Sequence, residues 1–125
     1  MSKIDKKKLI KIFLLIISFL WSTQLLSEND TKFVHGIEDL PLFSGMDNSF
    51  EDLIIFDTNE GRFATTKIYG MVKYEAVKNF YNNILPNLGW QKIEKFKYKR
   101  DNETLTLKYN LREKKVFLVF NIISN

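Results

Sequence analysis

The chain has 125 residues, of which 45% are hydrophobic and 27% are charged, and this balance is typical of a folded domain rather than a disordered tail. It has no cysteine, so disulfides, thiol nucleophiles, thiolate metal sites and a bacterial lipoprotein-type amino terminus are excluded. Residues 1–27 carry five bases and one acid, whereas residues 28–125 carry 14 of each, so the formal net charge of +4 lies entirely in the first segment. Net charge therefore gives no support to nucleic-acid binding by the remainder of the chain.

The first 27 residues have the plan of an export signal. Five lysines, Lys3, Lys6, Lys7, Lys8 and Lys11, lie ahead of the main apolar run. The run from Ile12 to Trp21 is apolar apart from Ser18. As a helix it spans about 15 Å against roughly 30 Å of hydrocarbon, which favours a signal peptide cleaved after Ser27 or Ser22. The alternative is a single membrane anchor that keeps residues 9–26. Both place the remainder in the periplasm or at the outer face of the inner membrane.

Residues 28–50 show no sustained period and predict an extended lead-in, in which residues 40–43 cover an apolar edge of the domain. The domain itself is expected over residues 51–125. Its first strand is predicted over residues 51–57 and its second over residues 63–69, because both runs are rich in β-branched and aromatic side chains. The Asx residues and the glycine between them predict a turn, and hence a hairpin.

Residues 73–85 carry the helix pattern of this domain. Apolar side chains recur at i, i+3, i+4, i+7, i+8 and i+11, at Val77, Phe80, Tyr81, Ile84, Leu85 and Leu88. Pro86 lacks an amide hydrogen and weakens the last turn, and Gly89 can supply a left-handed cap before Trp90. One amphipathic helix is therefore predicted.

The remaining residues predict strands. Residues 90–93 are expected to lead into a strand over 96–100, which ends at the turn pair Asp101 and Asn102. Residues 103–109 alternate in polarity, and residues 116–123 are apolar on both faces except at Asn121, which indicates an interior strand. The predicted fold class is α+β: a single small domain with the order β-β-α-β-β-β, in which an antiparallel sheet of four to five strands packs on the helix.

Residues 80–90 read F-Y-N-N-I-L-P-N-L-G-W, which resembles the F-Y-x-x-x-L-P-x-x-G-W pattern of a group of small exported bacterial proteins. Residues 39–42 and 56–62 are similar to the D-x-P-L and F-D-x-x-x-G-R segments of the same group. The likeness covers residues 39–110. These motifs are structural, so the resemblance implies export and a fold but no activity and no site residue. Lys73 departs from the pattern, since such proteins often carry a capping Ser or Asp there.

No residue is expected to be catalytic, to bind a cofactor or to ligate a metal. His35 is the only histidine and is expected on an exposed loop. The adjacent acids Glu38 and Asp39, and likewise Glu51 and Asp52, are expected to be solvated, because neighbouring side chains usually point apart and do not face each other across a cleft.

Two further patterns also favour a structural interpretation. Residues 57–61 begin like a calcium loop, but the twelfth position is Ile68 and not a bidentate Glu, so a plain turn is expected. Residues 96–100 interleave rings and cations as nucleic-acid-binding sheets do, and the same pattern describes a half-buried strand. Export makes a nucleic acid an unsuitable partner.

Charge is distributed unevenly along the mature chain. Residues 28–60 hold nine acids and one base, whereas residues 61–125 hold five acids and thirteen bases. The favoured interpretation is that the acidic lead-in folds over the basic sheet in weak, salt-screened pairs. The alternative is that a basic face stays open for an anionic surface such as lipid headgroups, or for an acidic partner.

The sequence thus predicts an exported, non-enzymatic envelope protein that acts by binding or assembly, with a protein or an anionic envelope surface as its partner and no cofactor. A membrane-tethered domain that keeps residues 9–26 is the first alternative. A small hydrolase is the second, although no motif supports it. Sequence alone does not indicate the pathway or the oligomeric state.

Overall fold

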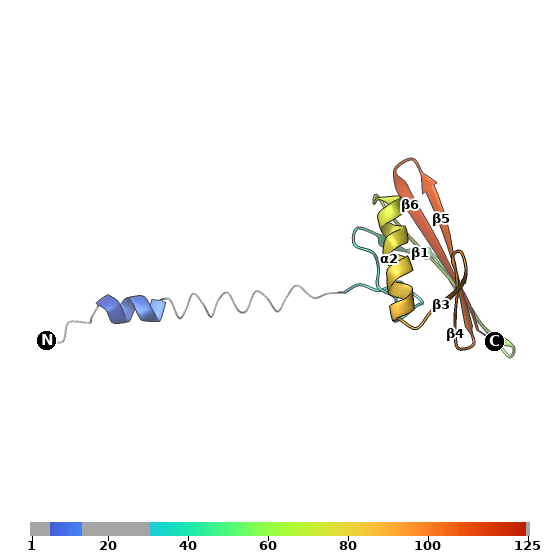
Figure 1. Cartoon of the computed structure of the whole chain (residues 1–125), viewed down its shortest axis with the longest axis horizontal. Helices are drawn as coiled ribbons and strands as arrows, with labels where there is room; N and C mark the ends of the chain where they lie inside the picture. The colour runs from blue at the N-terminus through green and yellow to red at the C-terminus, as the bar shows by residue number, and fades with distance from the viewer. Residues whose placement is uncertain (1–5, 14–30, 125) are drawn as a thin grey trace. The chain divides into compact units, whose positions relative to one another are not determined.

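The computed structural model describes residues 6–13 and 31–124, and the chain divides into two units, residues 1–31 and residues 32–125 (Figure 1). Residues 6–13 are helical. Most of the predicted signal run and both predicted cleavage positions lie outside the described residues. Among the residues that are described, no helix is long and apolar enough to cross a membrane.

Six strands form one antiparallel sheet, in the order β1-β2-β6-β5-β4-β3. Their bounds are Asp47–Thr58 for β1, Gly61–Gly70 for β2, Gln91–Glu94 for β3, Lys97–Arg100 for β4, Glu103–Arg112 for β5 and Lys115–Ser124 for β6. Helix α2, Tyr74–Asn87, follows β2 and lies against one face of the sheet (Figure 1). The predicted α+β class is confirmed.

The predicted count of four to five strands is wrong. Residues 91–100 do not form one strand with a leading segment, because the chain reverses at Lys95 and Phe96 to form the β3–β4 hairpin. Phe96 has φ 63°, a left-handed conformation that a bulky side chain rarely adopts. The turn contains no Gly, Asn or Asp, the residue types from which a reversal of the chain is usually predicted.

Helix α2 follows the predicted apolar stripe, with Val77, Tyr81 and Leu85 buried. Its first turn has no side-chain cap, as the lysine at position 73 leads one to expect. At the other end Gly89 adopts φ 91° and donates its N–H to the Pro86 carbonyl at 3.1 Å, while the Trp90 N–H reaches the Leu85 carbonyl at 3.0 Å. This pair of bonds is a Schellman motif, which satisfies carbonyls that the end of a helix leaves free.

The core lies between α2 and one face of the sheet. Strand β6 sits between β2 and β5, as predicted for an interior strand, and its alternate side chains Val116, Leu118, Phe120 and Ile122 are buried. Residues 32–46 pack on this same face and add Val34, Ile37, Leu40 and Met46 to the core. They do so through successive turns, which departs from the extended lead-in predicted for residues 28–50.

The side chain of Tyr81 anchors this segment to α2. Its hydroxyl donates to the Pro41 carbonyl at 3.0 Å and accepts from the Phe43 N–H at 3.1 Å. The ring is fully buried against Phe120, and this burial raises the pKa of the Tyr81 hydroxyl far above its usual range. The segment is therefore held by directed bonds as well as by apolar packing.

Replacing Gly70 with alanine is expected to destabilise the domain by about 1–3 kcal/mol. A Cβ at this position would lie 2.5 Å from the Gly45 carbonyl oxygen and 3.0 Å from the Met46 Cα, so the backbone of the segment would have to move. Urea unfolding of residues 28–125 measures the effect. A gain in stability, which the lower chain entropy of alanine alone would produce, would contradict this close approach.

Candidate functional site

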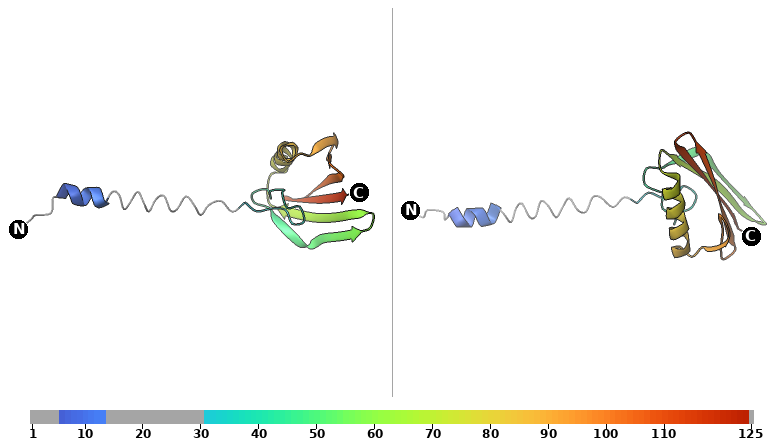
Figure 2. Two further views of the ribbon diagram at one scale, coloured as in Figure 1. Left: turned by 90° about the horizontal axis from the view of Figure 1, so that it is seen from below. Right: turned by 45° about the horizontal axis from the view of Figure 1, so that its top comes forward.

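The sheet presents a second face, opposite α2, which is called the open face here. No helix covers it within residues 32–124 (Figure 2). The strand register assigns its side chains as Asp47, Ser49, Ile54, Phe56, Phe63, Thr65, Lys67, Tyr69, Gln91, Glu94, Lys97, Lys99, Thr104, Thr106, Lys108, Asn110, Arg112, Lys115, Phe117, Val119, Asn121 and Ile123. This set contains six cations and two acids, so the open face is basic.

Three cations of the open face surround one aromatic ring. The Nζ atoms of Lys115 and Lys67 lie 5.7 Å and 5.8 Å from the centre of the Phe117 ring, and the Arg112 Cζ lies 6.0 Å from it. Lys115 also lies over the neighbouring Tyr69 ring at 4.7 Å, and the two rings stack with centres 6.4 Å apart. This cluster of five residues is called the cation–aromatic cluster. The rings hold the cations side by side, each contact contributing about 0.5–1 kcal/mol.

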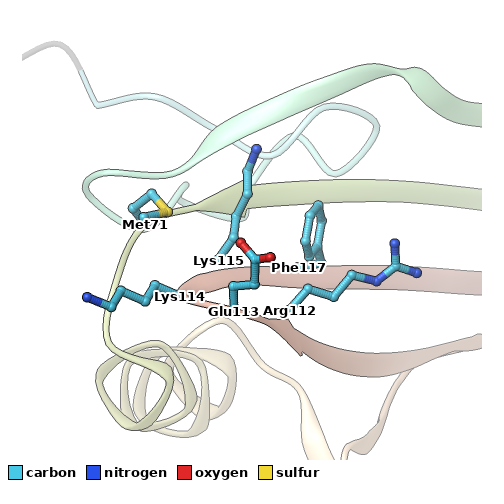
Figure 3. A pocket seen from close by; sticks show the side chains of 6 residues that line it. All are labelled: Met71, Arg112, Glu113, Lys114, Lys115 and Phe117. Atoms are coloured by element: carbon cyan, nitrogen blue, oxygen red, sulfur yellow. The ribbon is translucent and has the colours of Figure 1, made fainter.

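The β5–β6 turn forms an open pocket beside this cluster (Figure 3). Lys115 and Phe117 project side by side from β6, and the Arg112 side chain extends along the end of β5. The remaining lining residues are Met71, Glu113 and Lys114. With three cations and one carboxylate around exposed apolar atoms, this pocket suits an anionic group attached to an apolar one.

Most of the open-face cations have no acidic partner among the described residues. The exception is Lys67, which lies 3.5 Å from Asp52. A hydrogen bond from the Ser49 hydroxyl to Asp52, helped by the charge of Lys67, lowers the pKa of that carboxyl. Arg112 and Lys115 make no ion pair within the described part of the chain. Their mutual repulsion would be relieved by a bound anion.

The opposite end of the open face is apolar. Phe56, Phe63 and Ile123 face one another in register across β1, β2 and β6, and Ile54 adjoins them on β1. Phe56, Ile123 and Ile54 are exposed. On β2, about 14 Å of strand separates Phe63 of this apolar row from Lys67, the nearest member of the cation–aromatic cluster on that strand, since β2 rises roughly 3.4 Å per residue.

Of the residues singled out in the sequence, Glu51 and Asp52 border the cluster, whereas His35 and Asp39 lie away from it and have structural partners. The His35 ring packs on Phe50 with centres 4.6 Å apart, and its backbone N–H donates to Asn48 at 2.9 Å. Asp39 pairs with Arg100 at 2.5 Å, and Glu103 pairs with the same guanidinium at 3.5 Å. Arg100 thereby joins the segment before β1 to β4, so these carboxylates act as anchors.

Residues 57–61 form the β1–β2 hairpin turn, as predicted. Asp57 pairs with Arg62 at 3.6 Å, and the Thr58 hydroxyl donates to the Gly61 carbonyl at 3.0 Å. Asp101 and Asn102 form the β4–β5 turn, also as predicted. Within the described residues, no three His, Cys, Asp or Glu side chains lie close enough together to hold a metal ion.

The residues that precede β1 do not cover the open face. Residues 32–46 pack on the helix side of the sheet, and acids from residues 28–60 make three ion pairs with the basic half of the chain in the described structure, at Arg62, Lys67 and Arg100. The sequence shows the excess of bases but does not show the cluster itself. The available signal was the alternation of cations and rings at residues 67–69 and 115–117, which the β2–β6 register brings together.

Comparison with known proteins yields no relative, since no family model, curated protein or solved structure matches this chain.

Proposed function

We propose that the chain is an exported, non-enzymatic binding protein whose open face docks on the anionic surface of a lipid bilayer. The observation that carries the proposal is the cation–aromatic cluster, in which Arg112 and Lys115 have no acidic partner among the described residues. The apolar row on the same face adds a second kind of contact that a bilayer can accept. The export signal predicted for residues 1–27 would deliver the domain to such a surface.

The physical basis is the potential at a membrane that contains anionic lipids. Each Lys or Arg near that surface contributes about 1 kcal/mol, and the attraction decays within a Debye length of roughly 10 Å. Tyr69 and Phe117 suit the headgroup level, where aromatic rings concentrate in membrane proteins. Because one broad face carries the cluster and the apolar row, both can meet a flat surface at once.

Two further observations favour binding over hydrolysis. The open pocket at the β5–β6 turn has a single carboxylate, that of Glu113, so it lacks the pair of carboxylates that glycoside hydrolysis uses. The pocket bordered by Glu38, Asp39 and Glu103 holds Arg100, which already engages two of these three carboxylates.

The membrane-tethered alternative is compatible with the same surface. An anchor formed by residues 9–26 would raise the effective concentration of the open face at the bilayer without changing its chemistry. Amino-terminal sequencing of the protein from fractionated cells distinguishes a cleaved signal from a retained anchor. Either result leaves the docking proposal open to the following test.

Residues 28–125, which contain the whole buried core, are expected to co-sediment with phosphatidylcholine vesicles only when phosphatidylglycerol is added. Binding should fall steeply with salt, because the attraction is screened. The double variant R112E/K115E is expected to weaken binding at least about tenfold, since it reverses two charges of the cluster.

The matched control is K78E/K92E, which makes the same change of net charge at α2 and β3, on the helix side of the sheet. It is expected to bind like the parent domain. Equal loss in both double variants would show that net charge, and not the open face, governs binding. Absence of binding to anionic vesicles at low salt would remove the proposal.

A further inference from the structure

Strand β1 lies at one edge of the sheet, and its outer backbone groups have no partner strand in the described part of the chain. An unpaired edge is a template for another strand, and proteins usually protect it with lysine, proline, bulges or short length. Strand β1 runs for twelve residues and contains neither lysine nor proline, although its register with β2 is irregular between Ser49 and Ile54. Beyond this irregularity residues 54–58 pair continuously with β2, and they form the unprotected part of this edge.

The opposite edge, β3, is protected. It has four residues, it carries Lys92, and its register with β4 is irregular between Lys92 and Glu94. All three features discourage the addition of a strand. The contrast between the two edges of one sheet shows that the exposure of β1 is a local property of this strand.

The side chains of β1 are unusually apolar for a free edge. Phe50 is 76% exposed, Phe56 60%, Ile54 46% and Ile55 43%. Phe56 continues the row formed by Phe63 and Ile123, so that row ends at the free edge with nothing described beyond it. An added strand with apolar side chains would extend this row by one position.

The charges of β1 indicate which kind of strand could be added to it. Residues 47–60, comprising β1 and its turn, contain five acids and no base. Two of the acids pair with Lys67 and Arg62, while Asp47, Glu51 and Glu60 have no ion pair among the described residues. Pairing of β1 with β1 of a second copy would bring two acidic edges together, and like charges across strands are unfavourable.

We propose that β1 binds an extended segment of a partner protein in which aliphatic residues alternate with lysine or arginine. The segment adds a seventh strand by main-chain hydrogen bonds, its apolar side chains meet Ile54 and Phe56, and its bases lie on the other face beside the exposed Asp57. This site shares Ile54 and Phe56 with the open face, but it does not use the cations that carry the membrane-docking proposal.

The test uses residues 28–125 and a capped nine-residue peptide of alternating valine and lysine, with fluorescence anisotropy as the readout. The parent domain is expected to bind this peptide, but neither a valine–glutamate peptide nor a fully N-methylated valine–lysine peptide, which cannot donate main-chain hydrogen bonds. Equal binding of the N-methylated peptide would overturn the added strand.

The variant I54K is expected to weaken binding about tenfold, because it places a base on the free edge. The matched control is I93K, the same change at a similarly exposed isoleucine of β3, and it should leave the affinity unchanged. Equal affinity in I54K and the parent would overturn the site. Circular dichroism melts establish that both variants fold.

Sedimentation of the domain without peptide tests whether a second copy of the chain occupies β1 instead. A monomer that binds the peptide supports the proposal, whereas self-association that I54K abolishes would make a second copy the occupant and overturn it. The double variant R112E/K115E is expected to bind the peptide like the parent domain, so loss of the peptide site and loss of membrane docking are distinguishable.

Discussion

Replacing Trp90 with alanine is expected to destabilise the domain by about 3–5 kcal/mol, as for other fully buried aromatic side chains. Trp90 is 1% exposed and follows the Gly89 cap of α2. Its ring also supports the Arg100 guanidinium, whose Cζ lies 4.2 Å from the ring centre. Arg100 in turn donates to the Leu88 carbonyl at 3.0 Å, so the loss of the ring loosens the end of the helix as well as the core.

Urea unfolding of residues 28–125 measures this loss. The control is Trp90→Phe, which keeps most of the apolar area and removes an indole N–H that has no hydrogen-bond partner in the described structure. This control variant is expected to lower the free energy of unfolding by no more than about 1.5 kcal/mol. A Trp90→Ala variant as stable as the parent would show that the tryptophan is not part of the core.

Replacing Phe120 with alanine is expected to cost a similar amount, about 3–5 kcal/mol. Phe120 is fully buried on the central strand β6 and meets the Tyr81 ring edge to face at 5.3 Å. Because Tyr81 also binds residues 41 and 43 through its hydroxyl, a cavity here would weaken three parts of the fold together. The midpoint of thermal unfolding should fall accordingly.

The matched control lies on the same strand. Phe117 belongs to the open face and is only partly buried, so Phe117→Ala is expected to cost about 1 kcal/mol or less. The same variant should weaken binding to anionic vesicles, because it removes the ring around which the three cations gather. Equal destabilisation by the two changes would contradict the assignment of the two faces of β6.

Local signals along the chain predicted several elements correctly. The apolar stripe from Val77 to Leu85 predicted α2, and Gly89 takes the left-handed cap that was expected of it. The Asx-rich turn between β1 and β2 and the interior position of β6 are also confirmed. These features depend on the spacing of apolar residues and on the residue types at turns. Both are properties of short stretches of sequence and do not require the remainder of the fold.

Two features escaped prediction because their causes are not local. Phe96 turns the chain between β3 and β4 at a positive φ, and its ring packs on Tyr109 at 5.1 Å, a contact with a strand thirteen residues away. Residues 32–46 have no period, since their buried side chains lie on turns whose backbone bonds, such as Val34 N–H to the Leu40 carbonyl at 2.9 Å, follow no regular repeat. Tertiary packing supplies the order in both places.

Residue patterns were sufficient to predict that a helix with one apolar stripe packs on an antiparallel sheet, and the residue counts show that bases accumulate in the second half of the chain. The position of those bases depends on the pairing of distant strands. Antiparallel pairing of β2 with β6 and of β6 with β5 sets Lys67, Lys115 and Arg112 around Phe117, while residues 32–46 are drawn to the other face by the buried Val34, Ile37 and Leu40. Burial of apolar area outweighs weak, screened ion pairs, and for that reason the basic face remains open.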